Sequence, residues 1–216
     1  STGVIGQRLP VERIEEHLPE IQLEKNGSEK ANFAIMTTDT RTKTAAVEFT
    51  IGGKTCRIGG ICKGSGMIHP NMGTMLAFIT TDCAITHEML TEALQENVRK
   101  TYNRVTVDGD TSTNDMCVVL ANGKAGNELI DWQDEDYQAF CKALNEVNTR
   151  LARQIAADGE GATKLVTCTV SGSRSEEAAE RLAKAIVGSN LVKAAMFGAD
   201  ANWGRVLCAM GYSKAP

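Results

Sequence analysis

Long apolar runs are missing from this 216-residue sequence. A membrane-spanning helix needs ~20 consecutive apolar residues, and no run approaches that length. The first residues, STGVIG, also lack the basic start and the long apolar stretch of a secretory signal peptide. We therefore expect a cytoplasmic protein without a membrane partner. The sequence starts without Met, which fits a processed chain or a fragment.

An excess of positive charge is missing as well. The 23 Lys and Arg residues stand against 27 Asp and Glu residues, which gives a formal net charge of -4. Nucleic acids and anionic membranes attract basic proteins, so neither is expected as a partner. The seven cysteines include no Cys-X-X-Cys pair, which argues against a zinc site. We expect them to be reduced and mostly buried thiols.

Repeats, low-complexity segments and proline-rich linkers are also absent, and what is present is a mixture of strand and helix patterns. Short apolar or alternating segments predict strands over 44–51, 54–62, 74–81, 116–121, 164–170 and 191–197. Helical spacing predicts helices over 10–18, 28–36, 85–102 and 134–157, and another from a capping box at 173–176 to residue 188. Hairpins and crossovers together favour an α/β (α+β) fold, a layered sandwich of mixed β-sheets flanked by helices.

A Gly-Thr pair precedes the apolar run 75–79 in the stretch KGSGMIHPNMGTMLAFITTD, residues 63–82. A threonine hydroxyl is a poor nucleophile until a base removes its proton. If the chain is cut between Gly73 and Thr74, the new α-amino group of Thr74 is such a base, since its pKa near ~7.7–8.0 leaves part of it neutral. Gly73 has no side chain to shield its carbonyl from the hydroxyl. Alone, the pair is more typical of a turn that enters a strand.

Other segments give the pair a context, and they occur in a fixed order: STGVIG (1–6), TTD (37–39), KGSGMI (63–68), PNMGTML (70–76), DGDTSTND (108–115), EGATK (160–164) and GADANWGR (198–205). Together they resemble the ornithine acetyltransferase family of arginine biosynthesis, also described as glutamate N-acetyltransferases or bifunctional arginine biosynthesis proteins. The resemblance runs from end to end of the chain. It also implies the fold of that family, which is similar to that of N-terminal-nucleophile aminopeptidases.

The resemblance implies an acetyltransferase that carries its acetyl group on an N-terminal threonine. Family members transfer the acetyl group from N2-acetylornithine to glutamate by a ping-pong mechanism, and some also accept acetyl-CoA. They need no metal and no tightly bound cofactor. Their substrates are therefore small molecules.

The resemblance also implies self-cleavage of a precursor between Gly73 and Thr74. Residues 1–73 would then be the C-terminal part of an α chain, and residues 74–216 the N-terminal part of a β chain. Family members assemble as paired αβ units, so we expect an α2β2 protein. They more often have Ala in place of Gly73, and they extend beyond both ends of this sequence. Their C-terminal part supplies an Asn and a Thr or Ser to the substrate site.

The roles of the reacting residues follow from the same resemblance. Thr74 matches the nucleophile that becomes acetylated. Thr2 and Gly3 match the pair that stabilises the oxyanion of the tetrahedral intermediate, a contribution of roughly ~3–4 kcal/mol per donor in other acyl-transfer enzymes.

Three further residues match substrate-binding positions. Thr37 matches a binding hydroxyl, although its neighbour Thr38 also fits that place. Lys63 matches a binding lysine, and a cation suits the α-carboxylates of acetylornithine and glutamate. Glu160 matches a binding glutamate suited to an ammonium group of ornithine. Thr74 itself completes this set.

Some features allow two interpretations. The oxygen-rich run 108–115 fits a Ca²⁺ or Mg²⁺ loop or a hydrogen-bonded loop near the site, and its lack of EF-hand spacing favours the second. The run 202–205 either orders the substrate side or locks a turn. His69 is the nearest histidine to Thr74, but a threonine with its own amine needs no histidine base, so we interpret His69 as incidental.

Two other functions remain open from the sequence. One is a related N-terminal-nucleophile amidohydrolase or aminopeptidase, in which water accepts the acyl group. The other is an uncleaved relative without catalytic activity that serves only in assembly. Acetyl transfer to glutamate with little hydrolysis separates the acetyltransferase from the first, and cleavage before Thr74 separates it from the second.

Overall fold

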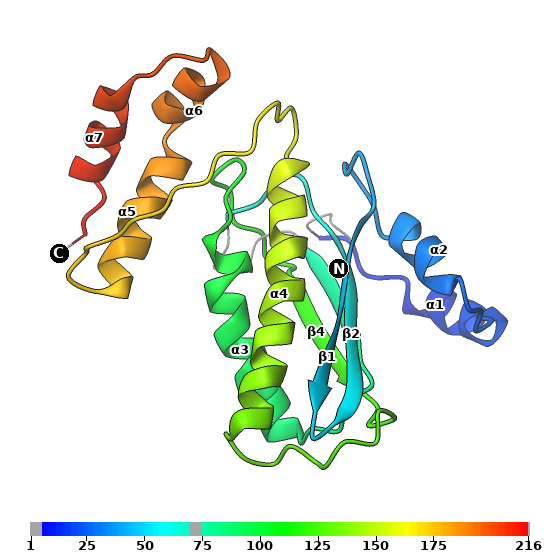
Figure 1. The fold of residues 1–216 in the computed structure, drawn as a ribbon. Helices are drawn as coiled ribbons and strands as arrows, with labels where there is room; N and C mark the ends of the chain where they lie inside the picture. Colours follow the sequence, from blue (N-terminus) through cyan, green and yellow to red (C-terminus); the bar gives the residue numbers. More distant parts are fainter. Residues whose placement is uncertain (1–5, 70–74, 216) are drawn as a thin grey trace.

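The structure is a computed structural model, and it describes residues 6–69 and 75–215. Its centre is a four-stranded mixed sheet with strand order β1-β2-β3-β4 (Figure 1). The strands are β1 (Lys43–Ile51), β2 (Lys54–Lys63), β3 (Leu76–Thr81) and β4 (Met116–Ala121). The first two pairs are antiparallel, and β3 pairs with β4 in parallel. This confirms the predicted α/β (α+β) class with a mixed sheet flanked by helices, and the described residues form one sheet.

The β1-β2 hairpin follows directly from its sequence. Its turn is Gly52-Gly53, and both residues have positive φ angles, 52° and 76°. Two positive φ angles suit a tight hairpin turn whose twist matches that of the strands, and glycine adopts them without a steric penalty. Just before the turn, buried Ile51 alternates with exposed Thr50, so one face of the hairpin points into the core.

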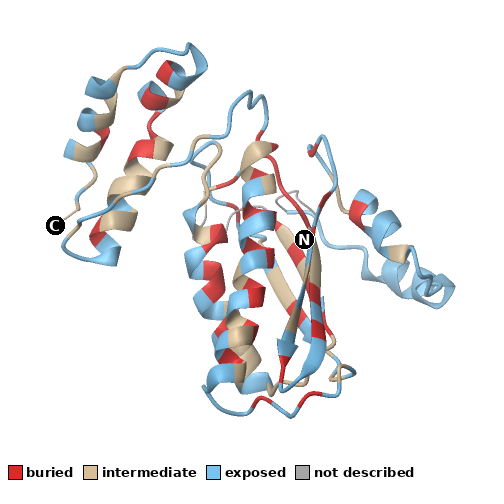
Figure 2. Ribbon diagram, in the orientation of Figure 1, coloured by how far each residue is buried: buried red, intermediate tan, exposed pale blue. Residues whose placement is uncertain are grey.

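Helices α3 (His87–Lys100) and α4 (Glu135–Ala157) lie over one face of this sheet (Figure 1). The Asp134 side chain accepts the Tyr137 N–H and so caps α4 at its first turn. The helix then presents an apolar stripe, spaced by three or four residues, to β1 and β2. The fully buried members of the stripe are Phe140, Leu144, Val147, Leu151 and Ile155. This interface is the main hydrophobic core (Figure 2).

Two of the predicted strands are wrong. Residues 191–197 lie in helix α6 (Asn190–Phe197), capped by Ser189, whose hydroxyl accepts the Val192 N–H. Val192 and Ala195 are three residues apart and both buried, so the segment packs with helical rather than strand periodicity. Residues 164–170 form no strand, because no described strand lies beside them to complete a hydrogen-bonded ladder.

The C-terminal third differs in two further details. Helix α5 (Glu176–Gly188) begins two residues later than the predicted capping box implies, since the capping residue is Ser175, which accepts the Ala178 N–H, and not Ser173. A further helix, α7 (Trp203–Gly211), was not predicted. Helices α5, α6 and α7 pack on each other around a small cluster of Ile186, Val192 and Ala209.

The N-terminal helices α1 (Val11–His17) and α2 (Gly27–Ala34) project from the opposite side of the sheet from α5–α7 (Figure 1). They are almost entirely exposed, and α1 has no buried residue (Figure 2). In the part of the chain that the structure describes, no helix is both long enough and apolar enough to cross a bilayer. All seven cysteines are free thiols, and only Cys208 is exposed.

Candidate active site

Three strand ends meet where β3 begins. Lys63, the last residue of β2, pairs with Leu76, the first residue of β3. On the other side, Met116, the first residue of β4, pairs in parallel with the same Leu76. The residues that follow Thr74 along the chain are therefore brought beside the ends of two other strands.

Met75, which directly follows Thr74 in the sequence, is held on both of its backbone groups. Its N–H donates to Asp115 Oδ1 at 2.8 Å, and its carbonyl accepts the Met116 N–H at 3.0 Å. The side chain of Met75 is buried as well. The peptide nitrogen that follows Thr74 is thus bound to a carboxylate.

Asp115 has a second oxygen with unused hydrogen-bonding capacity. Its Oδ2 atom is buried and has no hydrogen-bond partner among residues 6–69 and 75–215. Burial raises the pKa of Asp115, and the Met75 N–H and the charge of Lys63 oppose this without cancelling it. The sequence places Asp115 only in the run 108–115. Its position immediately before a strand that pairs with β3 is the signal that marks it.

Lys63 is a buried cation. It is 5% exposed, and its ammonium group makes no hydrogen bond and no ion pair with another residue in the described part of the chain, although its charge acts on Asp115. A buried ammonium without a bonded partner is costly, so an anion that reaches it is bound strongly. The arrangement suits a carboxylate, which is the group that the sequence assigns to this lysine.

The loop that follows Lys63 contacts Glu160, a residue almost a hundred positions later in the chain. The Glu160 N–H donates to the Ser65 carbonyl at 2.9 Å. The Glu160 carboxyl group lies against Gly66, where an added Cβ would come within 2.7 Å of Glu160 Cδ. Glycine at position 66 therefore leaves the space that the carboxylate occupies, and the carboxylate stays exposed to solvent.

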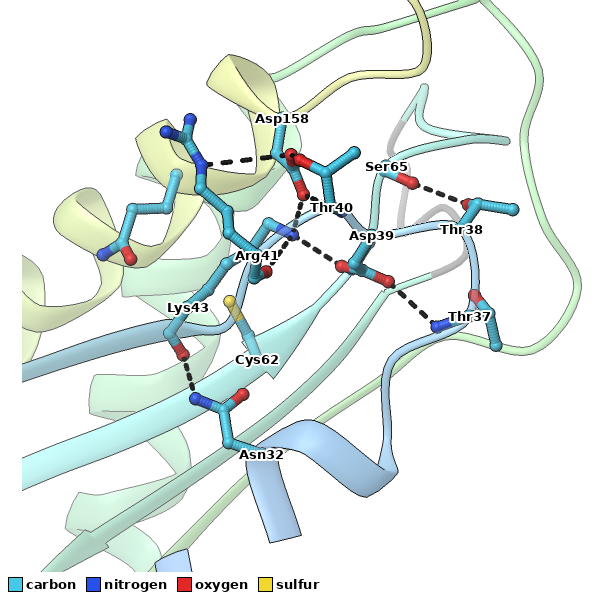
Figure 3. Close-up of polar contacts among 12 residues, drawn as sticks. Asn32, Thr37, Thr38, Asp39, Thr40, Arg41, Lys43, Cys62, Ser65 and Asp158 are labelled. Atoms are coloured by element: carbon cyan, nitrogen blue, oxygen red, sulfur yellow. Dashed lines mark hydrogen bonds and ion pairs between the residues drawn. The ribbon is translucent and has the colours of Figure 1, made fainter. Parts of the chain in front are cut away.

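Thr37 and Thr38 differ in how their hydroxyl groups are used. The Thr38 hydroxyl is hydrogen-bonded to that of Ser65, with 2.6 Å between the two oxygens (Figure 3). Thr37 donates its N–H to Asp39 Oδ2 at 3.2 Å, and its exposed hydroxyl makes no hydrogen bond with any described residue. The hydroxyl available to a ligand is therefore that of Thr37.

The structure thus connects the segments that carry Thr37, Lys63 and Glu160. Ser65 is the link, because its hydroxyl bonds Thr38 and its carbonyl bonds Glu160. The remaining predicted site residues, Thr2, Gly3, Gly73 and Thr74, lie outside the described residues.

Cavity size does not mark this site. A cavity of about 490 Å³ lies between α4, residues 165–170 and α5, and one of about 550 Å³ borders β1, β2 and β3. None of the three described site residues lines either of them. A smaller cavity of about 270 Å³ is bordered by Glu160, residues 161–166 and α6.

The first carboxylate of the run 108–115, that of Asp108, binds backbone N–H groups. Asp108 accepts the N–H groups of Met67, Ile68 and Asp110. These contacts fit the hydrogen-bonded loop that the sequence favours. The structure as described, residues 6–69 and 75–215, contains no group of three His, Cys, Asp or Glu side chains placed to hold a metal ion.

The two other ambiguous features are used structurally. His69 Nδ1 lies 2.9 Å from the Thr106 hydroxyl, and burial together with nearby lysine charges lowers the pKa of His69. Asn202 caps α7 by accepting the Arg205 N–H and donates to Asp200. These contacts support the turn-locking interpretation of the run 202–205.

Comparisons with known proteins give matches to one family along the whole chain. The sequence profile of the ArgJ family matches residues 1–216. The arginine biosynthesis bifunctional protein ArgJ 1 of Clostridium acetobutylicum is 52% identical over 217 residues, which cover 100% of this chain and 53% of that protein. The arginine biosynthesis bifunctional protein ArgJ of Shouchella clausii is 53% identical over 213 residues, covering 99% of this chain and 52% of that protein.

A solved structure is also similar. The crystal structure of the arginine biosynthesis bifunctional protein ArgJ from Bacillus halodurans matches with a TM-score of 0.63 and 53% sequence identity. The match covers 64% of this chain and 65% of that one. The chain spans about half the length of the curated relatives it matches.

Proposed function

The chain belongs to the ArgJ family, and on this premise we propose that it forms part of an acetyltransferase that moves an acetyl group from N2-acetylornithine to glutamate in arginine biosynthesis. Its relatives are named as arginine biosynthesis bifunctional proteins, which supports this pathway. The proposal includes acetyl-CoA as a second acetyl donor. The observation that carries the proposal is Lys63, a buried cation that bonds no other residue among 6–69 and 75–215 and lies beside the strand that follows Thr74. The protein then acts in the cytoplasm, where its small-molecule substrates are made.

The proposed chemistry starts with cleavage of the precursor. The Thr74 hydroxyl attacks the Gly73 carbonyl, the peptide bond becomes an ester, and water hydrolyses this ester. The products are a carboxylate at Gly73 and a free α-amino group at Thr74. Residues 1–73 then end an α chain, residues 74–216 begin a β chain, and the two pair as α2β2.

Acetyl transfer then takes place in two steps. The α-amino group of Thr74 accepts the hydroxyl proton as the oxygen attacks the acetyl carbonyl of acetylornithine. Thr2 and Gly3 stabilise the oxyanion, and ornithine leaves with the proton. The amine of glutamate next attacks the acetyl-Thr74 ester, which releases N-acetylglutamate and restores the hydroxyl.

Substrate binding uses the three described site residues. Lys63 binds the α-carboxylate that both substrates carry, which gives its buried ammonium group a directly bonded anion. Glu160 offers an exposed carboxylate to an ammonium group of ornithine. Thr37 rather than Thr38 donates or accepts the hydroxyl hydrogen bond, because the Thr38 hydroxyl is already bonded to Ser65.

The test is the intact mass of the full-length protein under denaturing conditions, beside a Thr74→Ala variant. We expect two fragments that meet between Gly73 and Thr74, absent from the variant. Adding acetylornithine should then add one acetyl group to the fragment that starts at Thr74, and adding glutamate should remove it. A single uncut chain would overturn the proposal. Loss of the acetyl group to water at the same rate without glutamate would indicate an amidohydrolase.

A further inference from the structure

Lys43, the first residue of β1, is a fully buried cation outside the proposed reaction. It is 0% exposed, and its Nζ atom lies 2.6 Å from Asp39 Oδ1 and 2.6 Å from Asp158 Oδ2 (Figure 3). Both carboxylate side chains are almost completely buried, at 0% and 4% exposed. The Arg41 carbonyl is a third acceptor at 3.4 Å. One ammonium group therefore joins two carboxylates that are more than a hundred residues apart in the chain.

The two carboxylate oxygens of Asp39 accept hydrogen bonds from the backbone at two places in the chain, Gly64 and Thr37. Its Oδ1 atom also accepts the Gly64 N–H at 2.7 Å, directly after Lys63. Its Oδ2 atom accepts the Thr37 N–H at 3.2 Å. The carboxylate thus fixes the backbone next to two of the residues that we assign to substrate binding.

Asp158 fixes the third segment. It lies directly after α4 and two residues before Glu160. It accepts both the N–H and the hydroxyl of Thr40, in addition to the Lys43 ammonium group. The chain that leads to Glu160 is thereby held against the chain that leads from Thr37.

A buried cluster of this kind is not explained well by stability alone. Removing three charged groups from water costs free energy that their mutual attraction offsets only with good geometry, and apolar side chains often stabilise a fold as well or better. What an apolar cluster cannot supply is a set of directed hydrogen bonds to the backbone of residues 37–41 and of Gly64. The cluster consisting of Asp39, Lys43 and Asp158 supplies these.

We propose that Lys43 is a positioning residue of the acetyl-transfer site, whose ion pairs with Asp39 and Asp158 hold Thr37, Lys63 and Glu160 at fixed separations. This rests on the proposed function. Lys43 does not contact the substrate in this role, and it acts through the segments that its two carboxylate partners hold.

The first test compares Lys43→Met, which keeps the length of the side chain and removes its charge, with Lys43→Arg, which keeps the charge. Both are made in the full-length protein. The KM for acetylornithine should rise about tenfold or more in Lys43→Met, because small displacements of binding groups have effects of this size. Lys43→Arg should recover part of the loss.

The second readout separates positioning from general damage. p-Nitrophenyl acetate carries no α-carboxylate and no ammonium group, so its reaction with Thr74 depends on the nucleophile alone. We expect its rate in Lys43→Met to stay within about twofold of that of the unchanged protein, and self-cleavage to go to completion. An equal loss with both acetyl donors would mean a purely structural role and would overturn the proposal, and so would an unchanged KM for acetylornithine.

Lys43→Met leaves two buried carboxylates without their cation. If this variant fails to fold, Asp39→Asn is tested in its place. Asparagine keeps an acceptor oxygen and removes the charge that binds Lys43. Asp39 holds the segments of both Thr37 and Lys63, so Asp39→Asn should raise the KM for acetylornithine more than Asp158→Asn does. Equal KM values in the two variants, or no change in either, would contradict the proposal.

If the unchanged protein forms no acetyl-Thr74, the proposed function fails and this inference fails with it. If the unchanged protein is active and the variants have the same KM as it has, this inference alone is refuted.

Discussion

At the scale of single residues, the described part of the site has two groups with unused bonding capacity next to β3. One is the ammonium group of Lys63, a 5% exposed residue that bonds no other described residue, and the other is the buried Oδ2 atom of Asp115, which has no hydrogen-bond partner among them. Native proteins bond nearly all buried polar atoms, so exceptions of this kind are typical of functional sites. Both residues flank β3, which begins two residues after Thr74.

Lys63→Met should weaken substrate binding without weakening the fold. A hydrogen bond to a charged group contributes about 1.5–3 kcal/mol, so we expect the KM for acetylornithine and for glutamate to rise about 10- to 100-fold. The free energy of unfolding should stay the same or increase, because an unpaired buried cation is replaced by an apolar side chain of similar length. Steady-state kinetics of the full-length protein measure the KM values, and urea unfolding measures the stability. Lys63→Arg is the matched control. A loss of stability with unchanged KM would show that Lys63 serves the fold instead.

Two substitutions of Asp115 distinguish the contribution of its hydrogen bond with Met75 to stability from the contribution of its charge. Asp115→Ala leaves the Met75 N–H without its acceptor, which should lower the free energy of unfolding by about 1–3 kcal/mol. Asp115→Asn keeps an oxygen for that N–H and should cost clearly less. Urea unfolding of both variants measures the difference. Equal losses would mean that the Met75 hydrogen bond is not what Asp115 contributes.

At the scale of secondary structure elements, α4 can approach β2 closely because β2 has glycine at position 60. An added Cβ there would lie 3.0 Å from Ile79 Cγ1 and 3.1 Å from Leu151 Cδ1. Both side chains are fully buried, so they have little room to move. The same helix ends at Asp158 and leads to Glu160, so its packing on the sheet also sets where the site residues lie.

Gly60→Ala should therefore destabilise the protein by about 1–3 kcal/mol through overpacking. Gly59→Ala is the matched control, since the neighbouring strand position has its nearest contact, Ala46 Cβ, at an ordinary 3.4 Å. We expect Gly59→Ala to change stability by less than about 0.5 kcal/mol. Thermal unfolding of both variants tests this, and similar melting temperatures would contradict it.

At the scale of the whole molecule, buried charges connect its distant parts. Burial alone would raise the pKa of Asp39 and of Asp158, but hydrogen bonds outweigh this in both cases, from Gly64 and Lys43 in the first and from Lys43 and Thr40 in the second. The pKa of each carboxyl is therefore lowered. A lowered pKa in the folded state means that the ionised form stabilises the fold.

This lowering predicts how stability depends on pH. The contribution of Asp39 and Asp158 is complete above their unfolded pKa values near ~3.9 and is lost as pH falls through the lower folded values. The urea midpoint should accordingly decline below pH ~4. In Lys43→Met the decline should be smaller or reversed, because the carboxylates lose the charge that lowers their folded pKa values, and a folded pKa above the unfolded one makes stability rise as pH falls. Glu12→Gln, which changes an exposed acid, should leave the profile unchanged, and an unaltered profile in Lys43→Met would contradict the expectation.

Packing is uneven across the molecule, and hydrogen exchange should report this. Helix α1 has no buried residue, whereas α4 carries the main apolar stripe of the core. Amide protons of α1 in this 216-residue chain should exchange at least ~100-fold faster than those of α4, because local opening of α1 exposes no core. Exchange measured by mass spectrometry after pepsin digestion resolves the two helices. Comparable protection would mean that α1 packs on a surface that the described contacts do not contain.

Local signals in the sequence were sufficient for much of this fold. Gly52-Gly53 specifies the hairpin because only glycine adopts two positive φ angles freely, and the spacing of Phe140, Leu144 and Leu151 specifies an amphipathic helix. The segment 191–197 was misjudged, because its apolar residues suit a strand or a helix and the neighbouring helices decide between them.

The sequence alone determined the family, the candidate residues Thr37, Lys63 and Glu160, and the class of the fold, since these depend on residue types and their order along the chain. Only the tertiary structure showed that Lys63 is buried and bonds no other described residue, that the Thr38 hydroxyl is bonded to Ser65, and that Lys43 joins Asp39 to Asp158. These facts depend on contacts between segments up to about a hundred residues apart. Neither spacing nor propensity along the chain encodes which distant groups meet, because that is decided when α4 packs on the sheet.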